Sequence, residues 1–332
     1  MKTAVIGSGG WGTALALTLY RNGHQVFLWS HDGQKAKQVC ESRENPMLPG
    51  IKLPEGLTGT GDDRCVTGCK MVVSASPSVH IREVCRRVAP YLDEDAVMVS
   101  VTKGIEQDTF LRMSQIVEEE THRPVVALTG PSHAEEVALQ MPTGCLAACA
   151  DKEKAELVQD AFMSDTFRIY TSPDIVGAEL GGALKNVIAL CAGTVEGLGY
   201  GDNTQAILIT RGLTEIARLG VAMGAQKETF AGLAGIGDLI VTCTSRHSRN
   251  RRAGVLVGQG MSAQEALQTV GAAVEGYYAA ASARTLALKL QVEMPIVEAA
   301  YQVLYNGRSA SDVLHILLNR QRRSESEDAL WH

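Results

Sequence analysis

The sequence predicts an α/β fold in which a doubly wound parallel sheet in residues 1–172 precedes an all-helical domain in residues 173–320. Six short apolar runs alternate with helical stretches up to about residue 172, which is the pattern of parallel β/α units. These runs are continuously apolar, as in strands that helices cover on both faces. Long helical periods without a clear strand then follow. A doubly wound sheet is the simplest arrangement of such units.

The expected strands are short and rich in Val, Ile and aromatic residues. In order they are residues 3–7 (TAVIG), 25–29 (QVFLW), 71–76 (MVVSAS), 96–101 (AVMVSV), 125–130 (VVALTG) and 167–172 (FRIYTS).

The second half of the chain has a helical period. The clearest expected helices are residues 174–195, 204–223, 274–290 and 295–305. Ser172 can cap the first of them, and Pro173 suits a first turn, so we place the domain boundary there. The last stretch, residues 321–332, is mostly polar and charged, and we expect it to fray.

The composition limits the possible functions. The 332 residues suffice for two domains, since a domain commonly holds about 100–200 residues. A net charge of −6 argues against a nucleic-acid partner. The start MKTAVIGSGG does not resemble a secretory signal. No uninterrupted apolar run approaches the roughly 20 residues that cross a bilayer. We therefore expect a soluble cytoplasmic protein without membrane insertion.

The cysteines do not indicate a metal site. None of the eight forms the C-x-x-C spacing of a zinc knuckle or redox pair. Cys65 with Cys69 and Cys145 with Cys149 invite a metal interpretation, but no histidine lies near either pair in the sequence. We expect reduced thiols and no bound metal.

A glycine-rich loop follows the first expected strand. Residues 7–12 read GSGGWG, which fits G-x-G-x-x-G, and they open a stretch with helical character. Gly7 and Gly9 would permit a tight turn and close approach of a pyrophosphate, and Gly12 close packing of helix on strand. The free N–H groups of the helix start would face the phosphates. This context is typical of a Rossmann-like domain that binds NAD or NADP.

The end of the second strand leaves the choice of cofactor open. Asp32 could bind the ribose hydroxyls of NAD, and His31 could contact a 2′-phosphate or the adenine. Alternatively, both are loop residues and Asp32 caps the next helix.

Two lysines lie where the sheet would meet the helical domain. Lys103 follows the strand at 96–101, at the carboxyl edge where open sheets bind ligands, although an exposed lysine is the ordinary interpretation. Lys185 lies among apolar neighbours in GGALKNVIAL. Burial lowers the pKa of an ammonium group and makes it a proton donor or acceptor near neutral pH. The alternative is a lysine that extends along the helix surface to water.

A basic segment follows a glycine-rich turn before Asp238. It carries arginines at 246, 249, 251 and 252. Guanidinium groups and free N–H groups at a helix start suit a dianionic phosphate, with Ser248 as the cap and Arg249 and Asn250 closing over it. The alternatives are a solvated charged surface or an RNA-binding patch, but the run is short and lacks aromatic residues.

Five segments together resemble the bacterial-type NAD(P)-dependent glycerol-3-phosphate dehydrogenase family over nearly the whole chain. They are GSGGWGTALA, LTGPSHAEEV, GGALKNVIAL, GLGYGDN and LAGIGDLIVTCTSRHSRNRR. The resemblance implies an oxidoreductase that interconverts dihydroxyacetone phosphate and sn-glycerol 3-phosphate and supplies the latter for phospholipid synthesis. It also implies that Lys185 transfers the proton, with Asp238 as its polar companion.

The same resemblance implies the binding residues. Those around the phosphorylated substrate are Lys103, Gly130, Ser132, Lys185, Asp238, Ser248, Arg249 and Asn250. Those at the cofactor, beyond the loop glycines, are Gly10, Trp11, His31, Lys103, Ala134, Arg249, Ala273 and Glu275.

Two other functions stay open. One is a 3-hydroxyacid or phosphogluconate-like dehydrogenase, which would take a carboxylate substrate, and the other is a module that senses NAD(H) without catalysis. The long apolar helices suggest a homodimer.

Overall fold

An eight-stranded sheet forms the N-terminal unit of the computed structural model, which describes residues 1–271, 273–322, 324 and 325. The strands lie in the order β3-β2-β1-β4-β5-β6-β7-β8. Their bounds are β1 (Lys2–Ile6), β2 (Gln25–Trp29), β3 (Thr58–Thr60), β4 (Met71–Ser74), β5 (Val97–Ser100), β6 (Val125–Thr129), β7 (Thr143–Ala148) and β8 (Phe167–Ser172). Strand order reverses at β1 and β4, which is where doubly wound sheets bind ligands at their carboxyl edge.

The structure confirms the six expected strands and corrects two points. Strands β3 (TGT) and β7 (TGCLAA) were not predicted, because glycine and alanine give them little of the β-branched signal of the others. The sheet is also not wholly parallel. Strand β7 pairs antiparallel with β6 and parallel with β8. A continuously apolar run predicts burial on both faces, but it does not specify strand direction.

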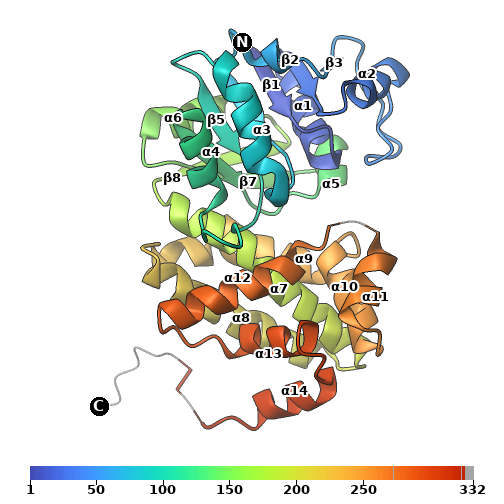
Figure 1. Cartoon of the computed structure of the whole chain (residues 1–332), viewed down its shortest axis with the longest axis vertical. Helices are drawn as coiled ribbons and strands as arrows, with labels where there is room; N and C mark the ends of the chain where they lie inside the picture. Colours follow the sequence, from blue (N-terminus) through green and yellow to red (C-terminus); the bar gives the residue numbers. More distant parts are fainter. Residues whose placement is uncertain (272, 323, 326–332) are drawn as a thin grey trace.

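Helices cover both faces of this sheet, as Figure 1 shows. Their bounds are α1 (Gly10–Arg21), α2 (Gly33–Ser42), α3 (Ile81–Val88), α4 (Met113–Thr121), α5 (Ala134–Ala138) and α6 (Lys152–Phe162). Leu15 of α1 and Phe162 of α6 belong to one apolar cluster with β1 and β6. Val88 of α3 and Ile116 of α4 belong to a second, with alternate residues of the same strands.

The second unit is helical and is built around α7 (Ile175–Gly197). The other helices are α8 (Asp202–Ala222), α9 (Asp238–Thr244), α10 (Arg249–Gly258), α11 (Ala263–Val270), α12 (Glu275–Lys289), α13 (Pro295–Leu304) and α14 (Ala310–Leu318). Helices α7 and α10 pack backbone to backbone. A β-carbon on Gly254 would lie 2.0 Å from the carbonyl oxygen of Leu190. This close packing holds the first turn of α10 beside the middle of α7.

The four expected helices are present, but the start of α7 differs from the prediction. Asp174, not Ser172, is the N-cap, and its carboxylate accepts a hydrogen bond from Gly177 N at 2.9 Å. The Ser172 hydroxyl instead accepts from Asp174 N at 3.1 Å. Pro173 therefore lies before the helix rather than in its first turn. Of the tail at 321–332, residues 323 and 326–332 lie outside the described residues, so the expected fraying stays a prediction.

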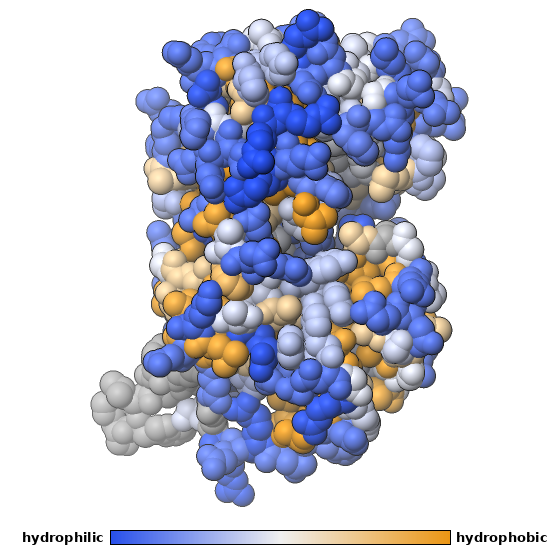
Figure 2. Space-filling view, viewed as in Figure 1, coloured by the Kyte–Doolittle hydropathy of each residue, from blue (hydrophilic) through white to orange (hydrophobic). Residues whose placement is uncertain are grey.

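Helix α7 is the one described helix that is long and apolar enough to cross a membrane, and 83% of its apolar window is buried inside the protein. In Figure 2 the sheet unit presents a mainly hydrophilic surface, and apolar residues gather over the helical unit. The hydropathy of α7 is thus explained by its central position in the second core.

Candidate active site

Lys185 is buried at the junction of the two units. Its side chain is 7% exposed, and its ammonium group forms an ion pair with Asp238 of α9. It also donates a hydrogen bond to the hydroxyl of Thr242 at 2.7 Å. The expected buried lysine is therefore present, and it does not extend along the helix surface to water.

Lys103 approaches the same carboxylate from the sheet. It follows β5, and its Nζ lies 2.7 Å from the second oxygen of Asp238 and 3.3 Å from the carbonyl oxygen of Gly130. Ser132 donates a hydrogen bond to that carbonyl oxygen at 3.0 Å. The structure thus brings together five of the residues that the sequence placed at the substrate: two lysines, Asp238, Gly130 and Ser132.

The electrostatics of this group favour proton transfer near neutral pH. Burial lowers the pKa of Lys185 to about 7; the charge of Asp238 opposes this shift, and the charge of Lys103 adds to it. Burial also acts against the charged form of Lys103, but the charge and hydrogen bond of Asp238 outweigh it, and the pKa of Lys103 lies above its ordinary value. Asp238 therefore keeps Lys103 charged, whereas Lys185 can exchange its proton near neutral pH.

The backbone before α9 positions Asp238. Residues Leu233–Gly237 form a π-helical turn that leads directly into α9, an irregularity that is frequent at functional sites. Asp238 is then the first residue of α9 and is 1% exposed. Thr242, which contacts Lys185, lies one helical turn further on. Thr242 was not predicted, although its spacing of four residues from Asp238 would have indicated it.

The glycine loop has the shape that a dinucleotide needs. Gly7 has φ +127°, which disfavours any other residue, and a β-carbon on Gly12 would lie 2.0 Å from the Gly7 carbonyl oxygen. A β-carbon on Gly9 would have no atom within 4 Å. Gly9 is also the N-cap of α1, and it has no side chain that could accept a hydrogen bond from the first N–H groups of the helix. The first N–H groups of α1 are therefore available to a pyrophosphate. These residues fit NAD or NADP.

Other expected cofactor residues surround this loop. The position of a β-carbon on Gly10, the first residue of α1, lies 3.9 Å from the β-carbon of Ala134, the first residue of α5. Trp11 is half-buried against the sheet cluster. His31 is exposed beyond β2. Asp32 caps α2 and accepts hydrogen bonds from Gln34 N and Lys35 N at 3.1 Å, as the capping alternative expected.

The basic segment forms the start of α10. Ser248 is its N-cap and accepts a hydrogen bond from Arg251 N at 3.2 Å. Asn250 is buried and donates to Asn186 Oδ1 at 2.9 Å, next to Lys185 in the chain. Arg249 is exposed at this helix start. Arg251 pairs with Glu196, so the four arginines do not act as one group.

Glu275 joins the basic segment to the sheet unit. It accepts a hydrogen bond from the Ser78 hydroxyl, which follows β4, at 3.0 Å. Burial raises the pKa of Glu275, and the nearby charge of Arg249 partly offsets this effect. Ala273, two residues earlier, is exposed. Neither Ser78 nor its contact with Glu275 was predicted, because nothing in the sequence pairs residues 197 positions apart.

Comparisons with known proteins agree over both units. The family described as NAD-dependent glycerol-3-phosphate dehydrogenase matches with its N-terminus at residues 2–155 and its C-terminus at 174–315. A relative named glycerol-3-phosphate dehydrogenase [NAD(P)+] from Pelotomaculum thermopropionicum is 50% identical over 98% of this chain and 95% of its own length. A protein of the same name from Bacillus subtilis is 48% identical over 98% of this chain and 96% of its own length.

Solved structures give the same result. The crystal structure of glycerol-3-phosphate dehydrogenase from Coxiella burnetii has a TM-score of 0.91 and 36% identity, and it covers 96% of this chain and 98% of that one. The yeast glycerol-3-phosphate dehydrogenase structure has a TM-score of 0.84 and 28% identity, with 96% and 99% coverage. The chain therefore belongs to the NAD-dependent glycerol-3-phosphate dehydrogenase family.

Proposed function

We propose that the site around Lys185 interconverts dihydroxyacetone phosphate and sn-glycerol 3-phosphate, with Lys185 exchanging the proton on the C2 oxygen. Family membership makes the chain an NAD(P)-dependent oxidoreductase of this class. The observation that carries the residue assignment is the ion pair of a buried lysine with Asp238, in which burial lowers the pKa of Lys185 to about 7. Such a lysine can both donate and accept a proton at neutral pH.

In the reducing direction, protonated Lys185 donates to the developing alkoxide. Asp238 and Thr242 each accept a hydrogen bond from its ammonium group, which leaves the third N–H of the protonated amine for the substrate. In the oxidising direction, neutral Lys185 accepts the hydroxyl proton. Lys103, which keeps its charge, stabilises negative charge that develops on the substrate oxygen.

Arg249 and the first turn of α10 anchor the substrate phosphate in this proposal. Arg249 is exposed at a helix start whose cap, Ser248, is itself buried. The helix N-terminus and a guanidinium group both favour a dianion. Binding energy from the phosphate would hold the reacting carbonyl beside Lys185.

The loop around Gly9 and the start of α1 would hold the pyrophosphate of the dinucleotide, with Trp11, Ala134 and His31 beside it. When bound, the nicotinamide supplies or takes the hydride at C2. The protein's own contribution is to position the substrate, exclude water and transfer the proton.

The two other functions have less support. A carboxylate substrate would leave the phosphate-suited start of α10 without a role. A sensor without catalysis would not need a lysine whose pKa burial lowers to about 7.

Lys185→Ala tests the assigned role. The variant is expected to lose most turnover in both directions, because no other group replaces the proton donor, while binding NADH as the wild type does. Quenching of tryptophan fluorescence on titration with NADH would measure binding. Lys70→Ala, which removes a lysine paired with Asp95 on the surface, is the matched control. Near-normal turnover of Lys185→Ala would exclude Lys185 as the proton donor.

We further propose a cytoplasmic enzyme that supplies glycerol 3-phosphate for phospholipid synthesis, with its two domains dividing at residues 172 and 173.

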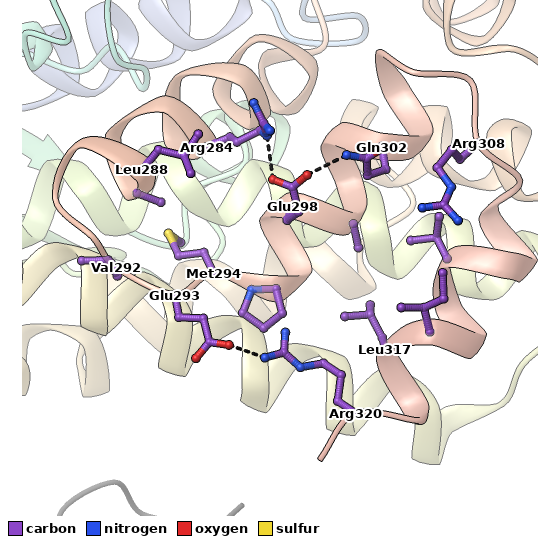
Figure 3. Close-up of a pocket in the computed structure, with 15 residues that line it drawn as sticks. Arg284, Leu288, Val292, Glu293, Met294, Glu298, Gln302, Arg308, Leu317 and Arg320 are labelled. Atoms are coloured by element: carbon purple, nitrogen blue, oxygen red, sulfur yellow. Dashed lines mark hydrogen bonds and ion pairs between the residues drawn. The ribbon is translucent and has the colours of Figure 1, made fainter. Parts of the chain in front are cut away.

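We also propose a homodimer. A groove of about 500 Å³ lies between α12, α13 and α14, and we propose a second copy as its occupant because apolar side chains line it. Figure 3 shows Leu288 and Met294 on one side and Leu317 on the other, with charged pairs at the rim. Leu288 and Ile316 beside it are 62% and 53% exposed.

A further inference from the structure

We propose that His133 is a further substrate-binding residue, whose Nε2–H donates a hydrogen bond to the phosphate of the substrate. This inference rests on the proposed function and extends it. His133 follows Ser132 and lies at the N-cap position of α5. Its side chain makes no capping hydrogen bond there, so the ring is not engaged in holding the helix start.

The ring of His133 faces the basic segment across the junction of the two units. Its centroid lies 5.9 Å from that of His247, with the ring planes at 53°. His247 directly precedes Ser248, the cap of α10. His133 therefore extends from the sheet unit to the turn that we assign to the phosphate.

Nε2 of His133 is the observation that points to a ligand. This nitrogen is buried, and no described residue forms a hydrogen bond with it. Buried polar atoms nearly always have a partner, since an unpaired one loses its hydrogen bond to water without replacement. A ligand that enters between the two units would supply the missing acceptor.

The charges around His133 suit a neutral donor. Burial lowers its pKa, and the positive charge of Lys185 lowers it further, against the smaller opposite effects of Glu136 and Glu135. The imidazole is thus neutral at pH 7 and donates one N–H. The charge of Lys185 acts on this ring, and the ring lies 5.9 Å from that of His247, which precedes the cap of α10.

If His133 donates a hydrogen bond to the substrate phosphate, removing its N–H should weaken binding of the phosphorylated substrate. His133→Phe keeps an aromatic ring but removes the N–H, and His133→Gln keeps an N–H donor. A hydrogen bond to a charged group corresponds to a factor of about 10 to 100 in an equilibrium constant. We expect the KM for dihydroxyacetone phosphate to rise by about that factor in His133→Phe. His133→Gln should recover at least part of the loss.

Dihydroxyacetone, which lacks the phosphate, separates this role from a structural one. Both substrates would be assayed at saturating NADH with wild type, His133→Phe and His133→Gln. We expect kcat/KM for dihydroxyacetone in both variants to stay within twofold of the wild-type value. An unchanged KM for dihydroxyacetone phosphate, an equal loss with both substrates, or no advantage of Gln over Phe would overturn the inference. A wild type that turns over neither substrate would instead contradict the proposed function.

Discussion

Lys185 owes its proposed role mainly to burial, which lowers its pKa, and this makes its pH behaviour predictable. Reduction needs the protonated amine and oxidation the neutral one. Because burial lowers the pKa of Lys185 to about 7, the rate of ketone reduction should be highest below pH 7 and fall above it. The rate of alcohol oxidation should rise through the same range. Initial rates in both directions between pH 5.5 and 9 would measure this.

Asp238→Asn is the matched variant for this profile. The charge of Asp238 raises the pKa of Lys185, so removing it should lower that pKa further and move the fall in reduction rate to lower pH. The amide keeps an acceptor for the lysine. A profile that does not move, or moves to higher pH, would show that another group controls the rate.

Individual residues differ in how far the sequence predicts them. Lys185 was singled out because a lysine among apolar neighbours is unusual on its own, whereas the role of Asp238 followed from the family resemblance. Ser78, Thr242 and His133 are ordinary residues whose importance comes from partners far away in the chain. Their roles depend on tertiary contacts, which a single sequence does not reveal.

In the glycine loop before α1, the absence of a side chain has a different consequence at each glycine. A β-carbon on Gly12 would meet the Gly7 carbonyl oxygen at 2.0 Å, whereas one on Gly9 would meet nothing within 4 Å. Gly12→Ala should therefore destabilise the sheet unit by about 1–3 kcal/mol. Gly9→Ala should leave stability within about 0.5 kcal/mol but weaken NADH binding, because its methyl group occupies the approach of the pyrophosphate.

Urea unfolding and NADH titration of both variants would test this. A stable Gly12→Ala variant would contradict the steric argument, and unchanged NADH affinity in Gly9→Ala would contradict the position assigned to the pyrophosphate.

Helices and strands whose own residues show a clear apolar run or helical period were predictable, and the others were not. The six expected strands are apolar enough to be recognised alone, and α7 and α8 are long and periodic. Strand β7 is made of small residues, and its antiparallel direction follows from its pairing with β6 rather than from its own sequence. The N-cap of α7 was misplaced by two residues, because Ser172, Pro173 and Asp174 all carry helix-start signals.

The two units are joined through the site itself. Lys103 reaches Asp238, Ser78 reaches Glu275, and Arg112 pairs with Glu179 of α7. Each contact connects the sheet unit to the helical unit. The two lysines are therefore brought to one carboxylate only when both units are in place, since Lys103 comes from the sheet unit and Lys185 and Asp238 come from the helical unit.

The proposed dimer is a prediction about the whole molecule. Leu288→Asp combined with Ile316→Asp should convert a dimer to a monomer, because a charge in an apolar interface is left without a partner. Light scattering coupled to size-exclusion chromatography would give the mass. Leu139→Asp, at an exposed apolar position on the sheet unit, is the control. A wild type with the mass of one chain, or a double variant that stays dimeric, would contradict this interface.

In the proposed function, the site around Lys185 reduces a phosphorylated ketone with a nicotinamide cofactor. The most direct test is the loss of absorbance at 340 nm when the purified protein is mixed with dihydroxyacetone phosphate and NADH or, separately, NADPH. We predict rapid turnover with at least one cofactor, and the ratio of the two rates would give the cofactor preference. The absence of turnover with both, in a protein that demonstrably binds the cofactor, would contradict the account.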